Sequence, residues 1–140
     1  MKNQKSLTLY SINPEYSNLI FSGKKTIELR KKLPKTRNKI IAVYETNPTK
    51  KVIGLCEVSD YYEFPIKKIG SFIKHAKVEK KFLLSYYKNK KQFAALRIAN
   101  YYKFKKPLTI KDFSEKQTLS APQSFYYLNK FSLSLILSIL

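Results

Sequence analysis

Residues 22–32 read SGKKTIELRKK and mark a change from one type of secondary structure to another. Just upstream, Asn13-Pro14-Glu15 is typical of a helix start, because Asn can cap free backbone N–H groups and Pro is tolerated in the first turn. Apolar residues recur at positions 16, 19 and 20, and Gly23 then supplies the left-handed residue that often ends a helix. We therefore expect a helix over about residues 14–22, followed by a strand over residues 26–31.

The two faces of this expected strand differ in chemistry. Ile27 and Leu29 point to one side, which a core can cover, while Thr26, Glu28 and Arg30 point to the other. Glu28 is the only acid in the window 24–39, which holds eight basic residues, so its partner is expected to be a cation. Two readings remain open: a solvated strand face with one ion pair worth ~0–1 kcal/mol, or a functional polar cluster.

The overall charge favours a polyanionic partner. The chain of 140 residues has 28 basic and 9 acidic residues, a net charge of +19 and a pI near 10.0. A genome rich in A and T would explain lysine in place of arginine but not the shortage of acids. Nucleic acid is the first partner to consider, and an acidic protein or an anionic membrane surface are the alternatives.

Several classes of chemistry are excluded by composition. One cysteine and one histidine cannot form a disulfide within the chain or a Cys/His zinc set. The nine acids are scattered and the three glycines form no phosphate loop, so no cofactor and no metal are expected. Neither end of the chain has an apolar run long enough to span a membrane, and the reduced cysteine fits a cytoplasmic protein.

Alternating and continuous apolar runs predict the remaining elements. Strands are expected over residues 7–12, 39–46, 52–59 and 92–104, with turn chemistry at 47–50 and a bend at Gly54. Residues 66–86 should form a helical region in two pieces, residues 108–113 one helical turn, and residues 114–121 a polar connector. Residues 122–128 should be extended and enter a last helix over 129–140 that packs on the domain. Five or six mostly antiparallel strands with few helices predict one α+β domain over residues 1–140, a small barrel with helices on its rim.

Aromatic and basic residues offer further candidate contacts. Four Tyr-Tyr doublets are spread through the chain, and their outward rings could stack on unpaired bases or could simply pack on the barrel. Seven lysines against a single acid between residues 74 and 91 make the helical region basic. A lysine beside Glu28 could act as a general acid or base if burial shifted its pKa.

With these residues laid out, the chain resembles the ASCH domain family, a branch of the PUA-like barrels. Residues 23–30, GKKTIELR, follow the family's G-x-K-T-x-E-x-R signature, and residues 11–16, SINPEY, precede it. Residues 44–48 with 52–54 resemble the family's hairpin, 94–98 its later strand and 122–128 its closing P-Q-S-F segment. The order and spacing hold over roughly residues 7–128.

The resemblance implies a PUA-like barrel with a cleft for RNA or a nucleotide-like ligand. The resemblance carries this role over to Lys25, Thr26, Glu28 and Arg30, with Ser11 and Ser124 nearby. From the residues themselves, Lys24 in the turn and Tyr44 complete the set expected to bind the ligand. Some relatives hydrolyse acetylated cytidine with a lysine and with a threonine that lies three positions after it. Lys25 matches the lysine, but the residue three positions after Lys25 is Glu28 instead of threonine. Other relatives are ribonucleases.

Three functions are therefore compared. The first is an RNA-binding domain that uses a basic cleft. The second is a small hydrolase acting on RNA or on a modified nucleoside such as acetylated cytidine, with Lys25 and Glu28 as its catalytic residues. The third is an interaction subunit whose lysine-rich faces meet an acidic protein.

Overall fold

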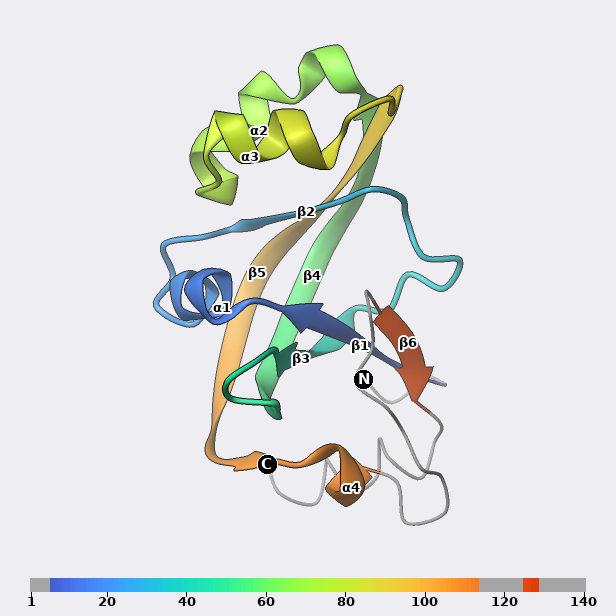
Figure 1. Cartoon of the computed structure of the whole chain (residues 1–140). Helices are drawn as coiled ribbons and strands as arrows, with labels where there is room; N and C mark the ends of the chain where they lie inside the picture. Colours follow the sequence, from blue (N-terminus) through green and yellow to red (C-terminus); the bar gives the residue numbers. More distant parts are fainter. Residues whose placement is uncertain (1–5, 114–124, 129–140) are drawn as a thin grey trace.

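The computed structural model of the chain describes residues 6–113 and 125–128. Within them, one six-stranded sheet has the order β2-β5-β4-β3-β1-β6 (Figure 1). The strands are β1 (Leu7–Ile12), β2 (Ile27–Arg30), β3 (Ile40–Glu45), β4 (Lys51–Pro65), β5 (Gln92–Leu108) and β6 (Phe125–Leu128). The helices are α1 (Pro14–Ile20), the short 3-10 helix η1 (Ile66–Lys68), α2 (Gly70–Ala76), α3 (Lys80–Tyr86) and α4 (Ile110–Phe113).

The sheet is mixed and mostly antiparallel, as expected for the α+β barrel. Strand β1 runs parallel to β3, and all other pairings are antiparallel. Strands β2 and β6 are the two ends of the order, and no backbone pairing joins them within the described residues. The barrel is therefore open along one seam, between β2 on one side and β1 with β6 on the other.

Strands β4 and β5 extend further than their sequence patterns predicted. Their ladder runs from Val52 opposite Leu108 to Pro65 opposite Gln92, so the expected ends at residues 59 and 104 are wrong. The reason is tertiary, because each strand supplies the backbone partners that the other's polar stretch needs. Gly54 permits the close approach of the two strands, since a Cβ there would lie 2.4 Å from the carbonyl oxygen of Tyr102.

The turn after α1 leads the chain into β2. The helix ends at Ile20, two residues earlier than expected, and the Gly23 N–H donates to the Ile20 carbonyl at 3.0 Å. Gly23 adopts a φ of +79°, the left-handed conformation predicted for it. Since the N–H groups of Lys24 and Lys25 both donate to the Leu19 carbonyl, the turn fixes the start of the signature segment against the helix.

Helices α2 and α3 are held at one end of the sheet by an apolar cluster. Ile27 and Leu29 of β2 meet Phe93 and Ala95 of β5 in this cluster, together with helix residues that include Ala76, Val78 and Leu83. The helical region forms in two main pieces as predicted, and Tyr86 of α3 packs against this cluster, whereas the side chain of Phe82 is exposed. The packing places α3 beside β2, as Figure 1 shows.

Three earlier predictions lie outside the described residues: the polar connector over 114–121, Ser124 as a site residue and the last helix over 129–140. No helix of the described part of the chain is both long and apolar enough to cross a membrane.

Candidate functional site

A cleft of about 560 Å³ opens at the seam of the barrel. Its lining comes from the end of β1 and the start of α1, from β2 and the residues flanking it, from α3, and from Phe125 of β6. The volume lies within the range of small-molecule sites, ~300–1,000 Å³. The segment predicted to hold the site therefore borders a real hollow.

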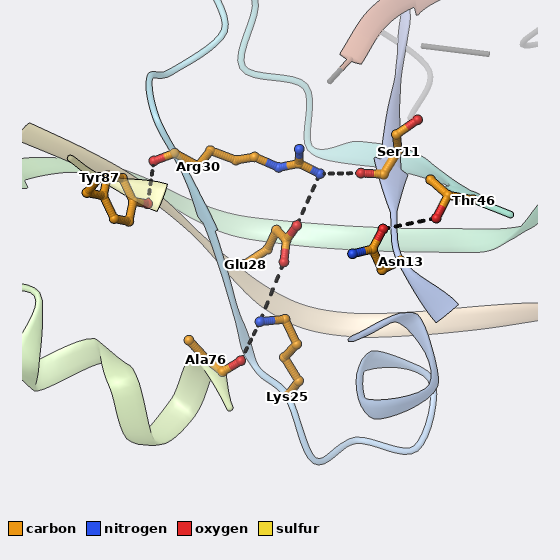
Figure 2. Close-up of polar contacts among 8 residues, drawn as sticks. All are labelled: Ser11, Asn13, Lys25, Glu28, Arg30, Thr46, Ala76 and Tyr87. Atoms are coloured by element: carbon orange, nitrogen blue, oxygen red, sulfur yellow. Dashed lines mark hydrogen bonds and ion pairs between the residues drawn. The ribbon is translucent and has the colours of Figure 1, made fainter. Parts of the chain in front are cut away.

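Three charged side chains of the signature segment meet in this cleft (Figure 2). The ammonium nitrogen of Lys25 lies 3.5 Å from Oε1 of Glu28, and Nη2 of Arg30 lies 3.1 Å from Oε2. Their side chains are only 1% (Lys25), 10% (Glu28) and 10% (Arg30) exposed. The reading of a solvated strand face is therefore wrong, because both faces of β2 are buried.

Backbone carbonyls fix both ends of this charged chain. Lys25 donates to the Ala76 carbonyl of α2 through a short hydrogen bond, and Arg30 donates to the Ser11 carbonyl of β1 at 2.8 Å. The hydroxyl of Tyr87 donates to the Arg30 carbonyl at 2.7 Å. Buried and partly buried hydrogen bonds to backbone carbonyls thus hold the signature segment, residues 23–30, against β1 and the helical region.

Burial changes the proton affinity of the cluster. Removal from water lowers the pKa of Lys25, and the Glu28 carboxylate partly opposes that shift by favouring the charged ammonium. Burial also raises the pKa of Tyr87, which keeps its hydroxyl protonated as a hydrogen-bond donor. A lysine shifted in this direction is closer to the range in which it can exchange a proton.

The rim of the cleft adds positive charge. Lys31, Lys32 and Lys90 line it together with Lys25 and Arg30, whereas Glu28 is the one carboxylate that the described residues contribute to the lining. Because the cluster of Lys25, Glu28 and Arg30 is itself net positive, the whole lining attracts an anion. In the described part of the chain, no three His, Cys, Asp or Glu side chains gather as a metal site would need.

An aromatic wall stands beside this charge; Tyr86 belongs to one of the Tyr-Tyr doublets considered for stacking, but the sequence prediction missed Tyr16 and Phe82. The rings of Phe82 and Tyr86 on α3 stack at 5.6 Å and 18°, and Tyr16 of α1 lies 6.2 Å from Phe82. The Lys31 ammonium sits 4.8 Å from the centre of the Tyr86 ring. The signal was the spacing of two aromatic residues four apart in a lysine-rich helix, which also fits ordinary packing. Phe82 at 43% exposure is a rim residue, not a core one.

The other predicted binding residues are not all brought to the cleft. Ser11 lines it, but Lys24 is exposed and Thr26 half-buried, and neither is part of the lining. The Thr26 backbone instead bonds to His75 and Ile98. Tyr44, 4% exposed, packs in an apolar cluster with residues such as Leu9 and Val52.

The position of Tyr44 follows from the alternation along β3. Ile41 and Val43 face the cluster on the cleft side of the sheet, together with Tyr10 and Ile12. Tyr44 comes next and faces the opposite cluster, after a register irregularity between Val43 and Tyr44. A place for Tyr44 in the cleft is therefore wrong for this structure.

The open mixed barrel with helices on its rim defines a PUA-like α+β fold. The family model of the ASCH domain matches residues 11–108, and the chain belongs to this family. The ASCH protein of Zymomonas mobilis is 24% identical, with 94% of each chain covered and a TM-score of 0.85. The N-terminal domain of McrB from Staphylothermus marinus is 13% identical, with a TM-score of 0.60 over 94% of this chain and 93% of that one. These two structures establish the fold alone.

A sequence relative is much longer than this chain. The large ribosomal subunit protein uL22 of two strains of Ureaplasma parvum is 30% identical over 122 residues, which is 86% of this chain. The matching stretch is only 38% of the length of uL22. The similarity therefore concerns one part of those proteins.

Proposed function

We propose that the cleft binds single-stranded RNA. The observation that carries the proposal is the buried cluster of Lys25, Glu28 and Arg30 in a hollow with a cationic rim and an aromatic wall. Proteins that bind single strands combine positive grooves for the backbone with aromatic rings for the bases. Both parts are present here within one cleft.

The two parts have separate tasks. The rim is formed by Lys31, Lys32 and Lys90. None of them pairs with a carboxylate in the described part of the chain, so a phosphate can bind them without displacing an ion pair. Phe82, 43% exposed, offers its ring to an unpaired base, a contact worth ~1–3 kcal/mol per base, and Tyr86 stacks against Phe82 and supports it. The buried cluster holds the walls in place and keeps a positive potential at the base of the cleft.

Net charge and relatives support the same class of ligand. A chain of net charge +19 gains from counterion release on any polyanion. The ASCH domain is a PUA-like fold, a class associated with RNA binding. The similar segment of uL22 belongs to a protein of the large ribosomal subunit, and ribosomes are built on RNA.

The test compares two pairs of lysines. Lys31→Glu/Lys32→Glu reverses two charges at the cleft, and Lys105→Glu/Lys106→Glu reverses two exposed charges near the end of β5. Affinity for a labelled single-stranded RNA, measured by fluorescence anisotropy across a salt series, should fall roughly tenfold or more for the cleft pair. The control pair should lose much less. Equal losses would show that bulk charge alone binds RNA, and no binding by the unmodified protein would refute the proposal outright.

A second variant tests the aromatic wall. Phe82→Ala should weaken RNA binding by about 5- to 150-fold, the loss of one stacked base. Leu84→Ala on the same helix, at an exposed position outside the cleft lining, is the control and should bind like the unmodified protein. Equal binding by Phe82→Ala would remove base stacking from the proposal.

A hydrolase is the second candidate, favoured by the lowered pKa of Lys25 and its 3.5 Å distance from Glu28. The substrate would be RNA or a modified nucleoside such as acetylated cytidine, with Lys25 as the proton-transferring group. Incubation with labelled RNA and with acetylated cytidine tests this candidate. Lys25→Met, checked for folding by circular dichroism, should abolish turnover, and unchanged turnover would exclude Lys25 chemistry.

A further inference from the structure

A second basic surface adjoins the cleft. The loop 31–39 between β2 and β3 carries five cations and no acid: Lys31, Lys32, Lys35, Arg37 and Lys39. Of these, only Lys39 pairs with a carboxylate in the described part of the chain, that of Glu57 at 3.6 Å. Lys35 and Arg37 are exposed, so their charges are open to a ligand.

Strand β6 connects this loop to the cleft. Phe125 lines the cleft, and its ring lies 5.8 Å from that of Tyr127 at an angle of 69°. The Tyr127 hydroxyl accepts a hydrogen bond from the backbone N–H of Thr36 at 3.0 Å. Figure 1 shows the loop running from the end of β2 to the side of β6. The cleft, the two rings and the loop therefore form one continuous path.

The chemistry of this path matches that of the cleft. Tyr127 is 40% exposed, so part of its ring can stack on a base. Arg37 directly follows Thr36, whose backbone N–H bonds to the Tyr127 hydroxyl. The Tyr127 ring and the cations of the loop lie next to each other. Proteins that bind single-stranded nucleic acid use this combination, with rings for the bases and cations for the phosphates.

We propose that an RNA strand bound in the cleft leaves it over Phe125 and Tyr127, and that its following phosphates contact Lys35 and Arg37. This inference rests on the proposed function of the cleft. The inference adds that the surface contacted by RNA is longer than the cleft, and that the RNA strand leaves the cleft toward β6. The ligand is then an oligonucleotide rather than a single nucleotide.

Two RNA lengths separate the cleft from the path. A dinucleotide fits the cleft alone, and a strand of about eight nucleotides lies within the ~4–16 that one small binding fold covers. Lys35→Ala/Arg37→Ala should weaken the longer strand about five- to tenfold and reduce its salt slope by ~1.4, the value for two phosphates on a single strand. Dinucleotide affinity should not change. Lys103→Ala/Lys105→Ala, two exposed lysines on the distal part of β5, is the matched control.

A second pair of variants tests the ring. Tyr127→Ala should weaken the longer strand, whereas Tyr127→Phe keeps the ring and should bind like the unmodified protein. Unchanged affinity of Lys35→Ala/Arg37→Ala for the longer strand would overturn the extended path, as would an equal loss in the control pair. A different result would refute the proposed function of the cleft: a dinucleotide that binds Lys31→Glu/Lys32→Glu as tightly as it binds the unmodified protein.

Discussion

Strand β2 is joined to its two neighbours in different ways. Toward β5 it forms a regular antiparallel ladder, from Ile27 opposite Arg97 to Arg30 opposite Ala94. Toward β1 the described residues show no ladder, and the contact is made by side chains, as when the Arg30 guanidinium reaches the Ser11 carbonyl. One side is closed by backbone hydrogen bonds and the other by buried charges.

The difference explains why the site lies where it does. Backbone groups in a ladder are fully used and have nothing to offer a ligand. Side chains that bridge an open seam leave a hollow between the strands. The charged groups there are held in place by ion-pair partners, which also offset the cost of removing the charges from water. The open seam is thus the part of the barrel at which a charged ligand can be received.

The largest expected effect comes from breaking the seam. Glu28→Gln leaves the buried charges of Lys25 and Arg30 without their carboxylate, and losing one partner of a buried ion pair costs about 3–5 kcal/mol. The free energy of unfolding, measured in urea, should fall by that amount. Glu57→Gln makes the same change at the pair with Lys39, whose side chain is 69% exposed, and should cost less than ~1 kcal/mol. Similar losses in both variants would mean that burial does not distinguish the seam.

An intermediate effect is expected from two buried tyrosines. Tyr87→Phe removes the donor to the Arg30 carbonyl and should destabilise the fold by ~1–3 kcal/mol. Tyr10→Phe removes a hydroxyl that has no hydrogen-bond partner in the described part of the chain, so it should be neutral or slightly stabilising. Thermal unfolding of both variants measures the difference. Equal destabilisation would show that the Tyr87 bond does not hold β2.

The smallest effect is a pH dependence that comes from Lys25. Its pKa in the folded state is lowered from the ordinary value of 10.5, so the unfolded chain binds more protons between the lowered pKa and 10.5. Stability therefore rises with pH in that window, by the linkage relation. Compared with Lys25→Met, the unmodified protein should gain stability as the pH increases toward about 10.

The tyrosines limit that measurement at its upper end. Burial raises the pKa of Tyr10, Tyr61 and Tyr87, so above pH 10 the unfolded chain loses tyrosine protons first and stability falls. Burial also raises the pKa of the Cys56 thiol from 9.0 to about 12, which lowers stability over part of the same range in both proteins. Urea unfolding at several pH values below 10, compared between the unmodified protein and Lys25→Met at each pH, isolates the lysine. A difference between the two proteins that stays constant or shrinks over this range would contradict the lowered pKa.

The local pattern predicted the elements near the seam well. The Asn-Pro-Glu start, the Gly23 turn and the alternation of Ile27 and Leu29 are properties of neighbouring residues, and the structure has all three elements. The expected cap is wrong in one detail, because the Asn13 side chain makes no hydrogen bond to the helix N–H groups and instead accepts one from the Thr46 hydroxyl. The pattern also singled out Glu28 as the partner of cations. Its burial was not visible, because the same alternation suits a strand with one face in water.

The lengths of β4 and β5 and the aromatic wall could not be read from local patterns. The strand predicted over residues 52–59 ended before residues 60–65, and the pairing of these residues with β5 makes them part of β4. Phe82 and Tyr86 fitted an ordinary apolar helix face, and only the packing of α3 beside β2 turns them toward a cleft. Tyr44 was expected to complete the polar group around residues 24–30, but β3 directs it to the opposite side.

The sequence by itself therefore determined the class of fold, the strongly positive charge and the segment that carries Lys25, Glu28 and Arg30, because composition and periodicity are local properties. Only the tertiary structure decided that the barrel stays open beside this segment and that an aromatic helix faces it. That decision depends on contacts between residues far apart in the chain, such as Arg30 with Ser11 and Lys25 with Ala76, which no local pattern contains.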